Sequence, residues 1–328
     1  MAGSLFMFIA ILYLGVAFFN EYGYWSFQYN DLTTLTHLGY NEKLLLFLAF
    51  ATAFAIKIPI FPFHTWITAT YSDAPTGGVF LLSSIMAKLG VYAVVRFMIP
   101  IFPDVFVQFS DVFVFLGIFG LVYFGIAALM QDDIKKMFAY SSASHLSLIA
   151  AGIFSLTSYG INGALYLIIA HAIATGGLFL LIGLLEDQTG FKTIKDLGGI
   201  AKKAPIFTFM FAVMLFSNVG LPATNGFVSE LLIIFGIYEF NHTMGYISAI
   251  TVLIAASFML WMFQRAILQD RVGGALQMRD LKLKEIVGLV PWVILIFLMG
   301  IYPDPFIEKF APTVTHYIDN FLQTGVIK

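Results

Sequence analysis

The sequence predicts an all-α polytopic membrane protein, and three observations support this. The chain has 328 residues, 60% hydrophobic and 11% charged, whereas soluble domains carry about 25% charged residues. Its mean hydropathy is +0.90. About nine runs approach or exceed the roughly 20 apolar residues that span a bilayer. They lie at about 4–19, 44–68, 77–98, 111–130, 137–154, 160–185, 206–236, 244–264 and 286–302.

Composition also excludes several classes of function. The net charge is −2, so there is no overall basic surface for nucleic acid, and we expect no nucleic-acid partner. The chain has no cysteine, which excludes disulfides and any cysteine-ligated cluster or metal site. We therefore predict no metal on this chain.

Basic residues indicate how the spans are oriented. Of the 17 Lys and Arg, eleven lie on one side of the predicted ladder of spans and four on the other, leaving two inside spans. Cytoplasmic loops carry the excess of positive charge. We therefore expect the loops at 131–136, 187–204 and 265–285 to be cytoplasmic, the N-terminus to begin inside, and the C-terminus to lie outside. Apolar residues at helical spacing in 305–322 predict an external amphipathic helix there.

The run 206–236 is too long for a single straight span. At 1.5 Å per residue it would extend about 46 Å, against a hydrocarbon core of about 30 Å. Pro222 removes a backbone donor, while Gly220 and Gly226 loosen the chain. The sequence therefore predicts a broken helix, whose freed backbone groups must line a cavity or be buried in protein.

Two further runs contain helix-breaking residues. Pro59 and Pro62 interrupt the run 44–68, and the pair Gly176 and Gly177 predicts a weaker break in the sixth run. Corresponding broken helices in two halves of a chain are typical of ion paths in transporters.

Five ionisable residues lie within or near apolar runs and form a predicted polar axis for moving protons. They are Lys57, Lys88, His145, His171 and Glu230. A lysine at membrane depth costs at least about 2.5 kcal/mol, so each such residue is a candidate functional site. An imidazole takes and gives a proton near neutral pH, which suits a relay.

Each of these residues also has a structural interpretation. Lys57 stands about two turns from the end of its span and could extend its ammonium to the interface, an explanation that fits Lys88 poorly because apolar chain flanks it on both sides. His145 and His171 could be polar contacts between helices. Glu230 could stabilise the start of the second half of its span, since carboxylates are favoured near helix N-termini.

Five stretches in order along the chain resemble one membrane-protein family. They are Lys57–Trp66 (KIPIFPFHTW), Asp73–Gly78 (DAPTGG), Lys88–Arg96 (KLGVYAVVR), Asp133–His145 (DIKKMFAYSSASH) and Gly220–Glu230 (GLPATNGFVSE). This set resembles the proton-translocating, antiporter-like subunits of respiratory complex I. His64, Asp73, Asp133 and Lys136 lie in these stretches and are secondary polar candidates.

Within that family the resemblance is to the M-type branch, the counterpart of mitochondrial ND-four. The L and N types, and relatives in multisubunit sodium/proton antiporters, usually carry lysine at the position of Glu230, whereas the M type carries glutamate. M-type chains have about fourteen spans in two inverted five-helix repeats, and the nine spans here resemble the last nine. We therefore expect that the N-terminal part, with the glutamate that pairs with the lysine matched by Lys57, is missing.

The resemblance implies a role for each residue on the axis. Lys57 would accept a proton in the first half-channel, Lys88 would link it to the membrane centre, the two histidines would relay it, and Glu230 would release it outside. FMN, iron–sulfur clusters and quinone are expected on partner subunits and no cofactor on this chain. The expected partners are other complex I membrane subunits, with L-type and N-type neighbours, in the lipid bilayer of the cell inner membrane.

The expected organisation has one complete inverted-repeat half and a partial one. Residues 1–110 would form the partial first half-channel, 111–270 the second, and 271–328 the final span and external tail. Two alternatives remain open: a subunit of a multisubunit cation/proton antiporter or membrane hydrogenase, and a truncated scaffold that does not pump.

Overall fold

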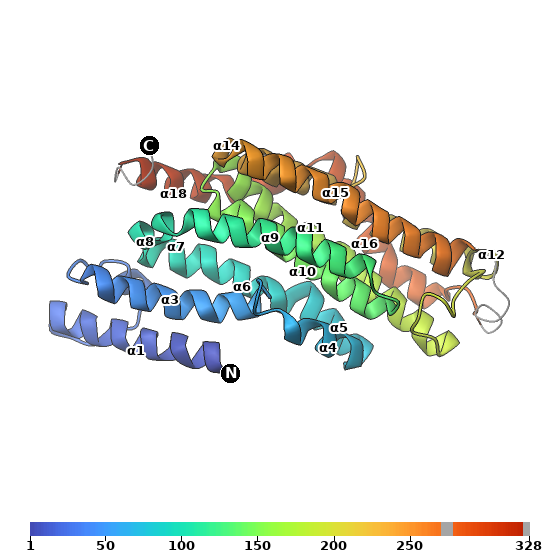
Figure 1. Cartoon of the computed structure of the whole chain (residues 1–328), viewed down its shortest axis with the longest axis horizontal. Coiled ribbons are helices and arrows are strands. Elements are labelled where there is room, and N and C mark those ends of the chain that lie inside the picture. The colour runs from blue at the N-terminus through green and yellow to red at the C-terminus, as the bar shows by residue number, and fades with distance from the viewer. Residues whose placement is uncertain (270–277, 324–328) are drawn as a thin grey trace.

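The computed structural model describes residues 1–269 and 278–323, and this part of the chain is a bundle of helices (Figure 1). Asp133 and Thr193 form an isolated antiparallel bridge there, and no strand occurs within these residues. Arg271 and Lys328, two of the basic residues used to orient the spans, lie outside the described ranges.

The helices follow one another with short connections. The first part of the chain forms α1 (Ala2–Tyr22), α2 (Tyr29–Leu32), α3 (Tyr40–Lys57), α4 (Thr65–Asp73), α5 (Thr76–Leu81), η1 (Leu82–Met86), α6 (Ala87–Ala93), η2 (Val94–Met98), α7 (Ile99–Ile101), α8 (Pro103–Gln108) and α9 (Ser110–Leu129). The second part forms α10 (Ile134–Phe154), α11 (Ser158–Thr189), α12 (Ile200–Lys203), α13 (Pro205–Val219), α14 (Asn225–Phe240), α15 (His242–Phe263), η3 (Gln264–Leu268), α16 (Leu283–Ile301), α17 (Asp304–Ile307) and α18 (Ala311–Gln323).

The all-α membrane fold is confirmed, and the number of spans depends on how broken runs are counted. Seven helical segments among the described residues are long and apolar enough to cross a membrane. The other two predicted runs, 44–68 and 206–236, are each divided into two shorter helices, α3 with α4 and α13 with α14. Helices α4, α13 and α14, with 9, 15 and 16 residues, are too short to span alone, whereas α3 has 18 residues but contains Glu42, Lys43 and Lys57.

The proline-containing breaks occur where the sequence places them. Helix α3 ends at Lys57 and α4 begins at Thr65, with Pro59 and Pro62 in the gap. Helix α13 ends at Val219, and Gly220 follows with a φ of 76°, a left-handed conformation that glycine adopts without strain.

Two details of the predicted breaks are wrong. Gly226 lies in the first turn of α14 rather than in the gap. Gly176 and Gly177 do not interrupt the sixth run, because α11 is continuous from Ser158 to Thr189. These two glycines permit close packing instead: a Cβ at position 177 would lie 2.2 Å from the Met214 sulfur.

Side chains in the connections define where the long helices begin. Asp133 accepts a hydrogen bond from the Lys136 backbone at 3.0 Å and starts α10. Thr157 accepts one from the Gly160 backbone at 3.0 Å and starts α11. Each cap satisfies a backbone donor that the first turn of a helix leaves without a partner.

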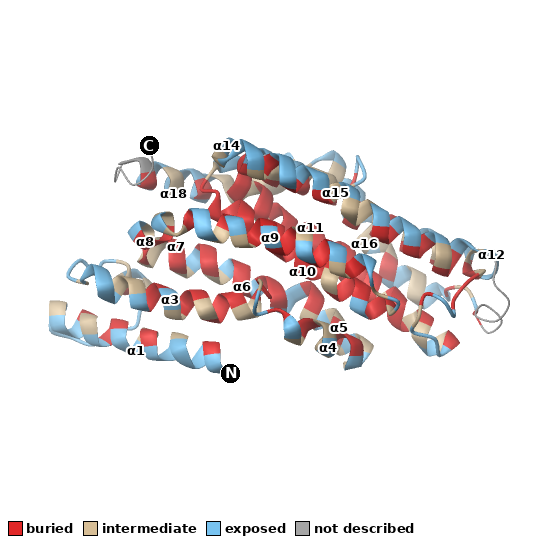
Figure 2. Cartoon of the chain, viewed as in Figure 1, coloured by how far each residue is buried: buried red, intermediate tan, exposed pale blue. Residues whose placement is uncertain are grey.

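Burial is highest in the centre of the bundle and lowest on its outer helices (Figure 2). In α10, 94% of the apolar window is buried, compared with 28% in α1 and 17% in α16. The exposed faces of α1, α15 and α16 are apolar, as expected for helices that contact lipid. Helix α10 is therefore shielded from lipid almost throughout, and a polar side chain on it faces protein.

The C-terminal segment forms α17 and α18, and its apolar residues face the bundle. Val314 and Phe321 are 0% and 2% exposed, and Phe306, Phe310 and Tyr317 pack against the core. The amphipathic pattern predicted for 305–322 thus corresponds to a helix whose apolar side covers the end of the bundle.

Tight packing between α11 and α14 yields a prediction about stability. A Cβ at Gly163 would lie 2.7 Å from the Ile233 backbone nitrogen, whereas nothing lies within 4 Å of one at Gly288 in α16. Gly163→Ala should therefore lower the free energy of unfolding by about 1–3 kcal/mol through overpacking. Gly288→Ala, the same chemical change, should be neutral or stabilising by up to about 1 kcal/mol.

Thermal unfolding of both variants in detergent, followed by tryptophan fluorescence, measures the difference. Equal midpoints for the two variants would contradict the packing described for α11 and α14.

Candidate functional site

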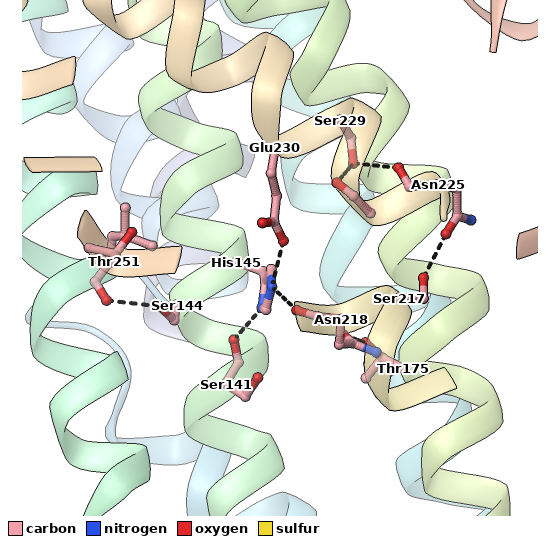
Figure 3. Close-up of polar contacts among 12 residues, drawn as sticks. Ser141, Ser144, His145, Thr175, Ser217, Asn218, Asn225, Ser229, Glu230 and Thr251 are labelled. Carbon is pink, nitrogen blue, oxygen red and sulfur yellow. Dashed lines mark hydrogen bonds and ion pairs between the residues drawn. The ribbon is translucent and has the colours of Figure 1, made fainter. Parts of the chain in front are cut away.

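His145 and Glu230 meet in the interior of the bundle. His145 projects from α10 and Glu230 from α14, and His145 Nε2 lies 3.2 Å from Glu230 Oε1 (Figure 3). The two residues are 5% and 6% exposed. Two ionisable groups 85 positions apart in the sequence are thus brought into direct contact away from solvent.

The break between α13 and α14 supplies a third group to this contact. The last four carbonyls of a helix have no partner within the helix, and Asn218 is the second-last residue of α13. Its backbone oxygen lies 3.1 Å from His145 Nε2. Glu230, in α14 on the other side of the break, packs directly against Gly220: a Cβ at Gly220 would lie 2.7 Å from Glu230 Oε2.

The surroundings of His145 restrict how the pair holds its proton. Nδ1 lies 2.9 Å from the Ser141 carbonyl, which only accepts hydrogen bonds, so Nδ1 donates. Nε2 faces the Asn218 carbonyl and the Glu230 carboxyl group. An imidazolium donates to all of these oxygens, whereas a neutral ring accepts at Nε2 from a protonated Glu230 and leaves the Asn218 carbonyl facing a lone pair. The site therefore has two arrangements of one shared proton.

His171 lies beside His145 but is not hydrogen-bonded to it. The ring centroids are 4.9 Å apart and tilted by 39°. His171 is 2% exposed, and neither of its ring nitrogens has a hydrogen-bond partner in the described part of the chain. These residues, with Ser217 and Gly226, surround a void that admits no water molecule in this conformation.

Lys88 is also buried, near His171. It is 4% exposed and lies close enough to His171 for their charges to interact. Its ammonium donates to the carbonyl of Ser83, five residues earlier, in the π-helical turn η1. Single π-helical turns within longer helices are frequent at functional sites. The structure thus brings Lys88, His171, His145 and Glu230 together in one interior.

Lys57 is placed at a different site. It is the last residue of α3, is partly exposed, and lines a cavity of about 610 Å³ with Trp66, Gly90 and residues of α1. A Cβ at Gly90 would lie 3.1 Å from the Lys57 Cγ, so the aliphatic part of the Lys57 side chain packs on α6, the helix that carries Lys88. Lys57 therefore borders the same helix without joining the buried cluster.

Hydroxyl and amide groups fix the two ends of the break, and sequence analysis did not assign them to the site. The Thr175 hydroxyl donates to the Asn218 side-chain oxygen at 3.2 Å, and Ser217 donates to Asn225 at 2.6 Å. Asn225 lies within the stretch Gly220–Glu230 quoted above, and Asn218 lies two residues before it. Polar side chains flanking a predicted break were the signal that could have identified them.

The secondary candidates are distributed over three places. His64 is 7% exposed, lies in the gap before α4 and has no partner for Nδ1 among the described residues. Asp133 caps α10, and Lys136 in the next turn is exposed. Asp73 is exposed at the end of α4. None of the four is in hydrogen-bond contact with His145 or Glu230 in the described structure.

A partly buried ion pair links the ends of α10 and α11, and the sequence analysis had treated Lys135 only as a loop cation. The Lys135 ammonium lies 2.5 Å from Glu186 Oε2 and is 7% exposed, and Lys192 lies 3.1 Å from the other Glu186 oxygen. The hydrogen bond to Glu186 raises the pKa of Lys192 above its ordinary value. This pair holds the two central helices together at the end opposite α18.

No group of three His, Cys, Asp or Glu within residues 1–269 and 278–323 is arranged to hold a metal ion.

Comparison with known proteins agrees with this architecture. Residues 1–259 match the family model described as "NADH:quinone oxidoreductase/Mrp antiporter, TM". The chain is 34% identical over 324 residues to NADH-quinone oxidoreductase subunit M of Rickettsia prowazekii, covering 97% of this chain and 64% of that protein. It is 31% identical to NADH-ubiquinone oxidoreductase chain 4 of Marchantia polymorpha, covering 97% and 63%.

A solved structure shows the same fold. A chain of respiratory complex I from Thermus thermophilus with bound NADH superposes with a TM-score of 0.88 at 31% identity, covering 97% of this chain and 68% of that one. The chain thus spans a little under two thirds of the length of the curated relatives that it matches. It belongs to the transmembrane family of NADH:quinone oxidoreductase and Mrp antiporter subunits.

Proposed function

We propose that this chain translocates protons across the membrane as the M-type subunit of an NADH:quinone oxidoreductase. The observation that carries the proposal is the His145–Glu230 contact at 3.2 Å, buried beside a broken helix. A buried ionisable pair is costly in a membrane and has two arrangements of one proton, which is what a carrier requires.

Each residue of the cluster takes one step in the proposed path. Lys88 passes the proton toward the membrane centre, and His171 hands it to His145. Glu230, which packs against Gly220 at the break, then releases it to the outside. Lys57 is proposed as the acceptor of the first half-channel, where it lines a separate cavity.

The path is continuous at one end and interrupted at the other. Direct proton transfer needs heavy atoms about 2.6–3.2 Å apart, or one bridging water. His145 and Glu230 meet this requirement, whereas His171 has no hydrogen bond to His145. We infer that side-chain rotation or water admission at His171 is the step that connects the lysine to the pair.

The partners and cofactors follow from the relatives. We propose that other complex I membrane subunits pack against the exposed apolar helices, with L-type and N-type subunits as neighbours. FMN, iron–sulfur clusters and quinone would be held by partner subunits, and a change in the charge of a neighbouring subunit would drive the relay. Residues 1–110 and 111–270 are proposed as a partial and a complete half-channel.

An Mrp-type cation/proton antiporter is the second candidate function, since the family includes both kinds of protein. A glutamate at position 230, rather than the lysine typical of that branch, favours the M-type reading. A scaffold without pumping is the third, and it predicts that Glu230 is dispensable.

Neutralising Glu230 distinguishes these functions. In inverted membrane vesicles carrying the assembled complex, Glu230→Gln should lower NADH-driven proton uptake and NADH oxidation together, by about tenfold or more, because the proton loses its terminal acceptor. Glu239→Gln makes the same change at an exposed position on the same helix and should leave both rates unchanged.

Subunit content must be equal in both preparations. Unchanged rates with Glu230→Gln would contradict the proton-carrier function and favour the scaffold. Na⁺-dependent transport without coupling to NADH would favour the antiporter.

The proposed orientation has its own test. Helix α12, which carries Lys202 and Lys203, lies at the opposite end of the bundle from α18 (Figure 1). Because the excess of basic residues is cytoplasmic, the α12 end should face inside. The chain has no native cysteine, so Lys136→Cys and Lys309→Cys each introduce one thiol at an exposed position.

A membrane-impermeant maleimide applied to right-side-out vesicles should label Lys309→Cys and leave Lys136→Cys unlabelled. The reverse pattern would invert the topology. Permeabilised vesicles, in which both thiols should react, provide the control.

A further inference from the structure

A groove lies between the C-terminal helix and the end of the segment Thr76–Ile101, away from the His145–Glu230 cluster. Its volume is about 550 Å³, and it is formed by residues of α2, η2, α7, the start of α8 and α18. Its polar lining comprises Tyr29, Thr33, Arg96, Thr313, His316, Tyr317 and Asn320. No Asp or Glu is among the described residues that line it.

Arg96 is the only fixed positive charge that lines this groove in the described structure, and no carboxylate within ion-pair distance is described for it. Its guanidinium lies 4.1 Å from the centre of the Tyr29 ring, and Tyr317 lines the same groove. By contrast, Lys43 in α3 pairs with Asp104 of α8 at 3.2 Å. A guanidinium that stacks on an aromatic ring keeps most of its five donors available for an anion.

The position of Arg96 along the helix places it near the membrane surface. It is five residues before the end of the apolar segment, which corresponds to about 8 Å at 1.5 Å per residue. The headgroup layer begins where the hydrocarbon ends, and an arginine side chain near a helix end extends toward that layer. The anion nearest to such a guanidinium in a membrane is the phosphate of a lipid.

The groove is also lined by apolar residues, which distinguishes a lipid from a free phosphate. Ile99, Pro100, Pro103 and Phe321 form the rest of its wall. His316 Nε2 and Asn320 Nδ2, 3.2 Å apart on successive turns of α18, add polar groups on the face opposite Arg96's helix. An amphipathic wall of this kind suits a polar headgroup with an acyl chain attached.

We propose that this groove binds one anionic phospholipid, with its phosphate held by Arg96 and the polar side of α18 and its acyl chain along the half-buried Pro100 and Pro103. Guanidinium and phosphate match in geometry and form paired charged hydrogen bonds. The lipid links α18 to the end of the transmembrane segment and so ties the C-terminal helix to the bundle.

Native mass spectrometry of the purified full chain in mild detergent tests this proposal. Phosphatidylglycerol, phosphatidylcholine and inorganic phosphate are titrated separately at matched concentrations. The wild-type chain should retain one phosphatidylglycerol at concentrations where the other two are not retained. Arg96→Gln should weaken this binding about tenfold or more. Arg96→Lys, which keeps the positive charge but loses the paired guanidinium donors, should weaken it by a smaller factor.

Lys43→Gln is the matched control, because it removes one positive charge at a site where a carboxylate already neutralises it, and it should bind as the wild type does. His316→Ala tests the opposite wall with little risk to folding, because the side chain is exposed, and should weaken binding about two- to threefold. Equal binding by Arg96→Gln and the wild type, equal retention of phosphatidylcholine, or displacement by inorganic phosphate would each overturn the proposal.

Discussion

The site depends on one constraint: a helix broken inside the membrane must place its freed backbone groups against protein. The end of α13 meets this requirement by directing the Asn218 carbonyl at His145, 3.1 Å away. Because that carbonyl only accepts, it favours a protonated imidazole, while Glu230 on the next helix offers the same proton a second position. The break thus creates the polar environment in which a buried acid and base are stable together.

The close approach of the central helices keeps this environment dry. Glycines on α11 and α14 let the helices pack at distances that a single Cβ would prevent, and Gly163 and Gly236 are examples. In lipid, small residues replace the hydrophobic effect as the basis for tight helix association. The same packing that buries the pair also fixes it: α10 is almost wholly enclosed, so His145 has no route to lipid.

The sequence predicts the spans and the proline-containing breaks well because both follow from local physics. An apolar run of sufficient length has few alternatives to a membrane helix, and Pro222 cannot continue the backbone hydrogen bonding at its position. Gly176 and Gly177 misled the prediction because glycine serves either flexibility or close packing, and only the neighbouring helix, here with Met214, decides which. The Asn218 contact and the Lys135–Glu186 pair depend on how distant helices dock, so hydropathy and charge counts did not reveal them.

The arrangement around His171 links structure to coupling. If the proposed relay were hydrogen-bonded throughout, protons would equilibrate between its ends, which the proposed pump must prevent between drive steps. His171, with no hydrogen bond to His145 and beside a void closed to water, separates Lys88 from the pair in the described conformation. A change in the charge of Lys88 alters the electrostatic environment of His171 directly, because the two groups interact. The charge on Lys88 would therefore favour one orientation of the His171 ring over another. Because packed protein interiors switch between discrete arrangements instead of deforming gradually, this preference would open or close the proton path.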